Sequence, residues 1–502
     1  IQGLLIGRFL GVVIISIIFF GNGDGEKVNN CMNKFFAQFK KTIYSTYLRH
    51  LVPAYHFFVN WLADVYYGHP SRQLIVIGIT GTTGKTTSVL LIAEVLRAAG
   101  YTVGYTSTAM FSDGQRDWLN DKKMTMVGRF FTQKMLWQMV HNGCHYAIIE
   151  TTSQGILQYR HRFINYDLAI FTGLYPEHIE AHGSFDNYRR AKGRLFSHLR
   201  RCGYKYVGSD KHVEKVDHGF KKVGLDKVPK TIIANLDDDY AHYFLSFGAD
   251  KAWGYTKNYK EKKDLEWPDY LTILEYDQIK SDIHGTDFIC EGQEIHLPLL
   301  GAFNASNAMT AIGVALSQDI DWPAIKAGLS AVKVLAGRLE IIDEGQPFSV
   351  IVDYAFEPVA LSKIYETLEL VPHKKIIHVL GSAGGGRDVA RRPKLGQIAG
   401  RLADIVIVTN EDPYDDDPRV IIEQVAVGAE YAGKERNKNL FTILDRREAI
   451  AKALSLAKKG DIVLITGKGS EQAICLAAGR KMPWDDRQVV REELAKLQFS
   501  ES

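Results

Sequence analysis

The sequence has 502 residues, of which 46% are hydrophobic and 24% charged, and its formal net charge is +3. This length is sufficient for two or three domains, each with its own core, and the small net charge argues against nucleic acid as a partner. We therefore expect small-molecule substrates. The five cysteines are scattered and none has Cys-x-x-Cys spacing, which argues against a disulfide framework or a zinc site and favours a cytoplasmic location.

The first stretch of the chain, residues 4–21, is apolar except for Arg8. A secretion signal or a membrane anchor has this composition, but the stretch is marginal for a bilayer span, which takes about 20 residues. The sequence starts with isoleucine, and its first methionine is Met32. We expect residues 1–31 to be upstream translated sequence and the native protein to start at Met32.

Aromatic and aliphatic side chains recur at helical spacing between residues 35 and 67, interrupted by Pro53. The pattern predicts two short amphipathic helices within an N-terminal segment of residues 1–71. Packing against the next domain is the favoured role for these helices. A weak contact of residues 35–67 with a membrane surface stays open because Lys34, Lys40, Lys41 and Arg49 are basic.

Residues 74–87 read as an apolar strand followed by a glycine-rich turn that ends in Gly84-Lys85-Thr86. In such a turn the backbone N–H groups can surround phosphate oxygens, the lysine can reach the terminal phosphates and the threonine hydroxyl can bind Mg²⁺. The strand before the turn and the helical pattern of residues 88–99 after it disfavour an ordinary glycine-rich turn. Five residues separate Gly78 from Gly84, one more than in the usual phosphate loop.

The rest of the sequence predicts an α/β fold with two parallel sheets. Residues 72–336 are expected to form a phosphate-loop ATPase domain, whose clearest further strands are residues 146–150 and 166–172. Residues 337–502 are expected to form a Rossmann-like domain with strands at 349–353, 375–380, 405–409 and 462–466. Because ligands bind at the carboxyl ends of such strands, one crevice should gather Asp353, Arg387, Asn410, Glu411, Lys468 and Glu471.

Glu150 ends a buried apolar strand, where a carboxylate is costly to bury without a cation. Two polar segments follow the next predicted strand, and they contain His178 and Lys192. A single histidine is more often structural than catalytic, and a single lysine more often forms a surface salt bridge. The two segments occur together with the phosphate loop and Glu150, and this combination favours a site.

These segments closely resemble the Mur ligases, in particular the UDP-N-acetylmuramyl-tripeptide synthetases, over nearly all of the chain from Gln73 onward. The family has the same lengthened phosphate loop. The resemblance implies an ADP-forming ligase that uses ATP and Mg²⁺. It also implies that Thr86, Glu150, His178 and Lys192 bind the metal ions, with Lys192 converted by CO₂ into a carbamate that serves as a ligand.

The resemblance implies the remaining site residues as well. Lys85, Glu150, His178 and Lys192 would be catalytic. ATP would contact Gly81, Thr82, Thr83, Gly84, Lys85, Thr86, Thr87, Asn235, Asn304, Arg338 and Asp353. A UDP-muramyl dipeptide acceptor would contact Thr125, Thr152, Gln158 and Arg160. The incoming amino acid would contact Arg387, Glu411, Asp412, Tyr414, Gly467 and Glu471, with Glu471 pairing to an amino group and Arg387 to a carboxylate.

The sequence departs from the family pattern in four places. Short aromatic helices at 35–67 stand where the family has its uridine-binding domain, Phe356 replaces a histidine, and Gly173 replaces an asparagine. The Asp-Asn-Pro-Arg signature associated with diaminopimelate reads Glu411-Asp412-Pro413-Tyr414. Without that arginine a distal carboxylate loses a bidentate partner, so lysine, ornithine or another diamino acid fits as well as diaminopimelate.

The expected reaction activates the acceptor carboxylate as an acyl phosphate, which the amine of a diamino acid then attacks during peptidoglycan precursor synthesis. An amide ligase like folylpolyglutamate synthetase is one alternative, although that branch typically has Gly-Lys-Gly-Ser in its loop. A noncatalytic ATP-binding regulator at a membrane surface is another. The sequence leaves the oligomeric state open.

Overall fold

The computed structural model describes residues 48–177, 182–214, 224–262, 266–282, 284–332, 335–386 and 389–497. The chain divides into two compact units, Ile1–Phe58 and Val59–Ser502, and the site lies in the second. The predictions for residues 1–47 fall outside the described residues. Among the helices that are described, none combines the length and apolar character needed to cross a membrane.

Helix α3 (Leu48–Tyr66) runs through Pro53 without a break, so the predicted interruption at that proline is wrong. Pro53 has no N–H and so removes one hydrogen bond of this helix, which continues through it. The C-terminal part of α3 and the residue that follows it contact the rest of the second unit. Asn60 donates to the Gln158 carbonyl at 3.1 Å, and the Tyr67 ring lies 6.4 Å from that of Trp137.

The first sheet has eleven strands in the order β13-β12-β11-β10-β9-β6-β1-β5-β2-β3-β4. Its central strands are parallel, and antiparallel strands extend both edges. The strands are β1 (Ile75–Thr80), β2 (Val103–Thr106), β3 (Met110–Ser112), β4 (Asp117–Leu119), β5 (Tyr146–Glu150), β6 (Leu168–Phe171), β9 (Thr231–Asn235), β10 (Lys251–Thr256), β11 (Leu271–Asp282), β12 (Gly285–Cys290) and β13 (Gln293–Leu297).

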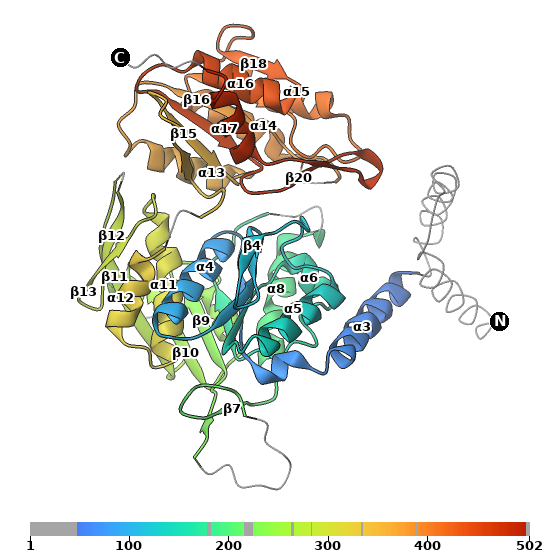
Figure 1. Cartoon of the computed structure of the whole chain (residues 1–502), viewed down its shortest axis with the longest axis vertical. Coiled ribbons are helices and arrows are strands. Elements are labelled where there is room, and N and C mark those ends of the chain that lie inside the picture. Colours follow the sequence, from blue (N-terminus) through green and yellow to red (C-terminus); the bar gives the residue numbers. More distant parts are fainter. Residues whose placement is uncertain are drawn as a thin grey trace, which may run out of the picture. The chain divides into compact units, whose positions relative to one another are not determined.

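Both faces of this sheet are covered, because its central strands are apolar on both sides. Ile75, Ile77 and Ile79 of β1 pack with one set of helices, and Val76 packs with the other. The first set is α4 (Lys85–Ala98), α11 (Phe303–Ser317) and α12 (Trp322–Ser330). The second is α5 (Arg129–His141), α6 (Ser153–Leu157), α8 (Phe185–Leu199) and α9 (Ala241–Leu245). Figure 1 shows these helices in blue to yellow around the strands.

The second sheet has six strands in the order β14-β15-β19-β16-β17-β18, and only β14 is antiparallel. The strands are β14 (Glu340–Ile342), β15 (Ser349–Asp353), β16 (Ile376–Leu380), β17 (Ile405–Thr409), β18 (Leu440–Ile443) and β19 (Ile462–Thr466). One face carries α13 (Pro358–Leu368), α14 (Arg391–Leu402) and α15 (Pro418–Tyr431), and the other α16 (Arg446–Leu456) and α17 (Asp486–Leu494). The predicted α/β class is confirmed.

Short elements complete the described chain: η1 (Pro70–Gln73), the β7–β8 pair (Tyr206–Val207, Asp226–Lys227), α10 (Tyr259–Lys262), the β20–β21 pair (Ala473–Cys475, Lys481–Pro483) and η2 (Ala477–Gly479). We call residues 72–336, built on the first sheet, the central lobe. Residues 337–502, built on the second sheet, are the C-terminal lobe.

Candidate active site

The phosphate-loop residues form a tight turn between β1 and α4. A Cβ on Gly81 would lie 1.9 Å from the Thr172 hydroxyl, and Gly84 has a φ of +79°. Glycine is therefore required at both positions for the chain to pass this close. The Thr82 N–H donates to the Gly173 carbonyl at 2.8 Å, and the Thr172 hydroxyl donates to the Thr83 carbonyl at 2.7 Å. These bonds hold the turn against the end of β6.

Lys85 is the first residue of α4, and its ammonium group lies against the turn. It donates to the Gly81 carbonyl at 3.0 Å and to the Thr82 carbonyl at 2.7 Å. Burial lowers the pKa of Lys85, and the nearby carboxylate of Glu150 acts in the opposite direction. The Lys85 amine is thus held at the turn by two backbone carbonyls, which a phosphate could replace as its partners.

Glu150 ends β5 and is 1% exposed, as the strand pattern predicts. Its carboxylate accepts hydrogen bonds from the Thr86 hydroxyl at 3.0 Å and from the Thr108 N–H at 2.7 Å. The Thr108 hydroxyl is also within hydrogen-bond distance of Glu150 and of the Thr125 hydroxyl, at 3.0 and 2.9 Å. Thr108 could not be identified as a site residue from the sequence, because it lies in an irregular turn between β2 and β3. These side chains join the phosphate loop to the predicted acceptor residue Thr125.

Lys192 is on α8 and is 2% exposed, not a surface lysine. Its ammonium donates to the Gly81 carbonyl at 2.6 Å and lies 4.6 Å from the centre of the Tyr188 ring. Burial, together with the charge of Lys85, lowers the pKa of Lys192 well below its usual value. Burial at this position therefore favours the uncharged form of the amine.

The loop after β6 brings Tyr175 and Glu177 to the same place, and neither was singled out from the sequence. The Tyr175 hydroxyl donates to Glu357 of the C-terminal lobe at 2.7 Å. Glu177 is 6% exposed, and burial, with the charge of Glu357 nearby, raises its pKa to about 7. The predicted metal ligand His178 lies outside the described residues.

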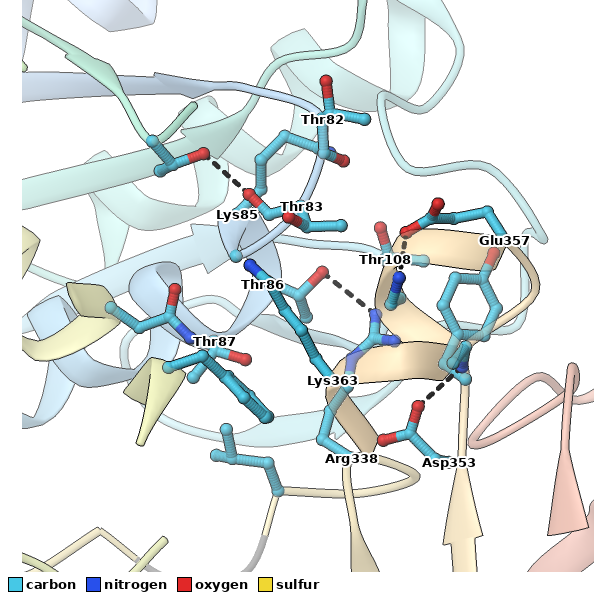
Figure 2. A pocket seen from close by; sticks show the side chains of 18 of the residues that line it. Thr82, Thr83, Lys85, Thr86, Thr87, Thr108, Arg338, Asp353, Glu357 and Lys363 are labelled. Carbon is cyan, nitrogen blue, oxygen red and sulfur yellow. Dashed lines mark hydrogen bonds between the residues drawn. The ribbon is translucent and has the colours of Figure 1, made fainter. Parts of the chain in front are cut away.

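Two residues of the C-terminal lobe that were predicted to contact ATP are adjacent in space. Arg338 donates to the Thr86 hydroxyl at 3.3 Å, and its guanidinium carbon lies 4.4 Å from the centre of the Tyr354 ring. Asp353 accepts from the Leu339 N–H at 2.7 Å and so holds the turn that carries Arg338. Figure 2 shows Arg338 meeting Thr86, with Lys363 of α13 among the surrounding side chains. Lys363 is a further cation that the sequence did not indicate.

The other predicted ATP contacts, Asn235 and Asn304, use their amides locally. Asn235 donates to the Thr172 carbonyl at 3.2 Å, and Asn304 donates to the Leu300 carbonyl at 2.8 Å. The predicted acceptor residues are also engaged. Thr152 caps α6 by accepting from the Gly155 N–H at 3.1 Å. Arg160 donates to Gln158 at 2.6 Å, and burial, with Arg129 nearby, lowers its pKa to about 10.

Two of the residues predicted for the incoming amino acid, Asp412 and Glu471, form an ionic cluster with two lysines. Lys468 donates to both carboxylates, at 2.9 and 2.6 Å. Lys123, from the central lobe, lies 2.7 Å from an Asp412 oxygen and 3.1 Å from a Glu471 oxygen. Gly467, with a φ of +107°, lets Glu411 approach, since a Cβ there would lie 2.4 Å from a Glu411 oxygen. The predicted residue Arg387 is outside the described residues. Lys123 was not predicted from the sequence to belong to this site.

One cavity of about 930 Å³ connects these groups. Its walls include the phosphate loop from Thr82 to Thr87 and most of the other predicted site residues: Thr125, Glu150, Thr152, Gln158, Arg160, Asn235, Asn304, Arg338, Asp353, Glu411, Asp412, Tyr414, Gly467 and Glu471. Lys192 and Gly81 do not line this cavity, and they are joined by their own hydrogen bond. A triphosphate, a carboxylate and an amine can therefore share one space.

Comparisons with known proteins agree with this architecture. Residues 79–228 and 220–315 match the Mur ligase middle domain, and residues 337–469 match the Mur ligase, glutamate ligase domain. The UDP-N-acetylmuramyl-tripeptide synthetase of Roseiflexus sp. (strain RS-1) is 35% identical over 444 residues, covering 87% of this chain and 82% of the relative.

A second relative is named for a particular amino acid. The UDP-N-acetylmuramoyl-L-alanyl-D-glutamate--2,6-diaminopimelate ligase of Geobacillus kaustophilus (strain HTA426) is 32% identical over 434 residues, covering 86% of this chain and 81% of the relative. Among solved structures, Mycobacterium tuberculosis folylpolyglutamate synthase with ADP and AMPPCP has a TM-score of 0.59 at 17% identity, covering 84% of this chain and 95% of that one. At that identity the likeness concerns the fold alone.

Proposed function

The chain belongs to the Mur ligase family of ATP-dependent ligases that make peptidoglycan precursors, and on that premise we propose that it adds a diamino acid to UDP-N-acetylmuramoyl-L-alanyl-D-glutamate. The observation that carries the proposal is the single cavity that holds the phosphate loop, Glu150 and the cluster around Glu471. A noncatalytic ATP-binding regulator would need only the first of these three features.

The proposed reaction has two steps on one substrate carboxylate. The γ-phosphoryl group of ATP passes to the glutamyl carboxylate, giving an acyl phosphate and ADP. The amine of the incoming amino acid attacks the acyl carbon, phosphate leaves, and the nitrogen loses a proton as the amide forms. Lys85 and the loop N–H groups would hold the phosphates, while Thr152, Gln158 and Arg160 would orient the acceptor.

The residues present fit the Mg²⁺ that Mur ligases use. The Glu150 carboxylate and the Thr86 hydroxyl are buried oxygen donors 3.0 Å apart, which is the ligand type that Mg²⁺ prefers. A bound Mg²⁺ would supply positive charge to the phosphoryl group being transferred. Glu150 and Thr86 would hold it, and His178 and a carbamate on Lys192 would hold a second ion.

The carbamate on Lys192 is supported by the burial of that amine beside Lys85. CO₂ adds only to an uncharged amine, and the lowered pKa favours this form. We expect Lys192→Ala to reduce acceptor-dependent ADP formation by about 100-fold or more, as loss of a charge-stabilising group does. Formate or acetate should partly restore the rate. Lys394→Ala, at an exposed lysine on α14, is the control. Full activity of Lys192→Ala would refute the carbamate.

The test of the function is ADP formation by the purified protein with ATP and Mg²⁺. UDP-muramyl dipeptide is combined in turn with L-lysine, L-ornithine and meso-diaminopimelate, and pteroate with glutamate serves as the alternative acceptor. Turnover that requires both the muramyl dipeptide and one diamino acid supports the proposal. Turnover with pteroate would assign the chain to the folate branch, and the absence of acceptor-dependent turnover would indicate a regulator.

A further inference from the structure

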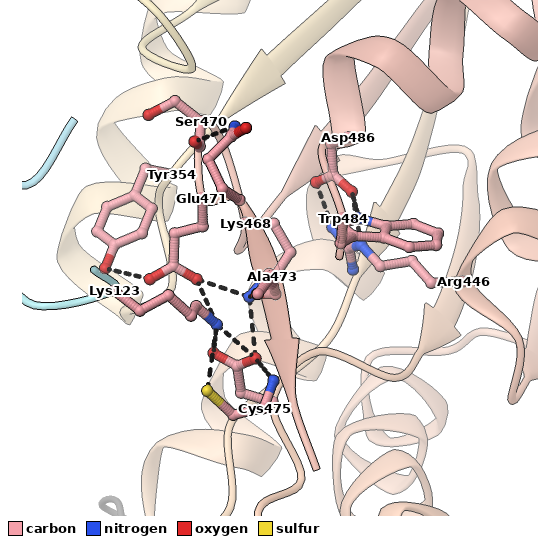
Figure 3. Close-up of polar contacts among 12 residues, drawn as sticks. Lys123, Tyr354, Arg446, Lys468, Ser470, Glu471, Ala473, Cys475, Trp484 and Asp486 are labelled. Atoms are coloured by element: carbon pink, nitrogen blue, oxygen red, sulfur yellow. Dashed lines mark hydrogen bonds and ion pairs between the residues drawn. The ribbon is translucent and has the colours of Figure 1, made fainter. Parts of the chain in front are cut away.

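Lys123, Lys468, Asp412 and Glu471 form a closed cluster in which each lysine contacts both carboxylates. Lys123 contacts both Asp412 oxygens, at 2.8 and 2.7 Å, and one Glu471 oxygen at 3.1 Å. Lys468 contacts the same two carboxylates from within the C-terminal lobe and also donates to the Ala473 carbonyl at 2.7 Å. Figure 3 shows both ammonium groups directed into the space between the carboxylates.

Lys123 is the member of this cluster that comes from the other lobe. Its side chain is only 4% exposed, although it lies on the turn between β4 and α5, next to Lys122, whose side chain is 44% exposed. If Lys123 left, Asp412 would keep Lys468 and the Cys475 N–H, and Glu471 would keep Lys468 and the Tyr354 hydroxyl. The buried Asp412 and the partly buried Glu471 would then share Lys468 as a cation, and such an imbalance of charge is unfavourable.

Another alkylammonium can remove this imbalance. Resting on the proposed function, we propose that Lys123 is a resident substitute for the distal ammonium of a basic amino acid substrate, which binds between Asp412 and Glu471 by displacing it. Lys123 would then compete with substrates that end in an ammonium group, because only such a group can take its place between the two carboxylates. The residue acts as an internal competitor.

The distal ammonium is the group that fits this position, not the reacting amine. An amine that attacks an acyl phosphate must lose its proton, whereas one held by two carboxylates keeps it. Lys123 also differs from a carboxylate-binding residue that would replace the family's missing arginine. Its ammonium has three donors, and the structure directs them at three carboxylate oxygens, so none is left for a carboxylate of the substrate.

The first experiment measures binding by calorimetry, with no dependence on turnover. The ligands are L-lysine and L-norleucine, which lacks only the distal ammonium, and the proteins are wild type, Lys123→Met and the neighbouring control Lys122→Met. A resident competitor reduces apparent affinity in proportion to the fraction of time it occupies the site. We expect Lys123→Met to bind L-lysine about tenfold more tightly than wild type. Norleucine binding and the Lys122→Met protein should be unchanged.

A second measurement uses the wild-type protein and covers the case in which Lys123→Met does not fold. Reductive methylation followed by peptide mass spectrometry gives the labelling of Lys123 relative to the exposed Lys122. L-Lysine should raise this ratio several-fold by freeing Lys123, and norleucine at the same concentration should not. An unchanged ratio, or unchanged or weaker lysine binding by folded Lys123→Met, would overturn the proposal. Weaker binding of diaminopimelate by that variant would instead identify Lys123 as a carboxylate ligand.

The two proposals fail separately. If the wild-type enzyme uses a neutral amino acid and Lys123 does not respond to lysine, the ligase function stands and the displacement proposal falls. If lysine displaces Lys123 but no acceptor-dependent ADP is formed, the displacement stands and the proposed reaction falls.

Discussion

At the scale of single residues, burial changes the pKa of two side chains in a way that their residue type alone does not indicate. Glu177 and Lys192 are both enclosed near the phosphate loop, and in each case burial favours the uncharged form. Burial therefore lowers the tendency of both groups to carry charge.

Glu177 gives a prediction about pH and stability. Its pKa is about 7 in the folded protein against 4.5 for the ordinary side chain, so the folded state binds more protons in this interval. The contribution of Glu177 to the free energy of unfolding is therefore present below about pH 4.5 and is lost as the pH rises through about 7, a decrease of about 3 kcal/mol. This contribution can be measured by urea unfolding of wild type and Glu177→Gln at pH 5 and pH 8.

We expect Glu177→Gln to be more stable than wild type at pH 8 and close to it at pH 5. Glu369→Gln, at an exposed position that ends α13, should shift the stability equally at the two pH values. An equal difference between Glu177→Gln and wild type at both pH values would contradict the raised pKa.

At the scale of elements, the connection from β1 to α4 could be predicted from the sequence because every determinant is local. The run of apolar residues, the glycines and the lysine that starts the helix lie within residues 74–87. The strands ending at Glu150 and Asp353 were predicted for the same reason. The continuity of α3 through Pro53 was not, because a proline inside a helix removes a hydrogen bond and usually breaks or kinks the helix.

The cross-lobe contacts could not be predicted, because they depend on how distant segments meet. Lys123 and Asp412 are 289 residues apart, and nothing in the sequence around Lys123 marks it as different from Lys122. The burial of Lys192 likewise depends on the packing of α8 below the phosphate loop. From its local sequence that lysine resembles a solvent-exposed one.

Gly84 gives a prediction for the phosphate-loop element. In Gly84→Ala the new Cβ would lie 2.4 Å from the Asn307 amide oxygen, at a φ of +79° that disfavours any side chain. Gly100→Ala is a matched control, because Gly100 has a φ of +88° and nothing within 4 Å of the new carbon. Both variants should lose about 1–2 kcal/mol of stability from backbone strain.

Only Gly84→Ala should weaken ATP binding, by about tenfold or more, since a turn displaced by a fraction of an ångström no longer fits the phosphates. Titration of each variant with a nonhydrolysable ATP analogue tests this. Equal affinities in the two variants would show that the Asn307 contact is unimportant.

At the scale of the whole unit from Val59 onward, the candidate active site is assembled from two lobes that meet through polar contacts. Tyr175 donates to Glu357, which in turn accepts from the Val359 and Ala360 N–H groups at the start of α13. This bond links the loop after β6 to the first helix of the C-terminal lobe. Its charged acceptor gives it a strength of about 1.5–3 kcal/mol.

We expect Tyr175→Phe to favour separation of the lobes when no ligand is bound. Its radius of gyration in small-angle X-ray scattering should exceed that of wild type, and a bound ATP analogue should reduce the difference. Tyr431→Phe, at a tyrosine that is 86% exposed on α15, is the control and should match wild type. Identical scattering from Tyr175→Phe and wild type would mean that other contacts keep the lobes together.

Tyr354 contacts two parts of the candidate site, and this position is relevant to the design of inhibitors. Its ring supports Arg338 beside the phosphate loop, while its hydroxyl donates to Glu471 at 3.3 Å. One aromatic side chain thus touches a residue that we propose binds the nucleotide and a residue that we propose binds the amino acid. On that proposal, a compound that displaces this ring would impair both halves of the reaction at once, and a substitution of Tyr354 that confers resistance would also reduce activity.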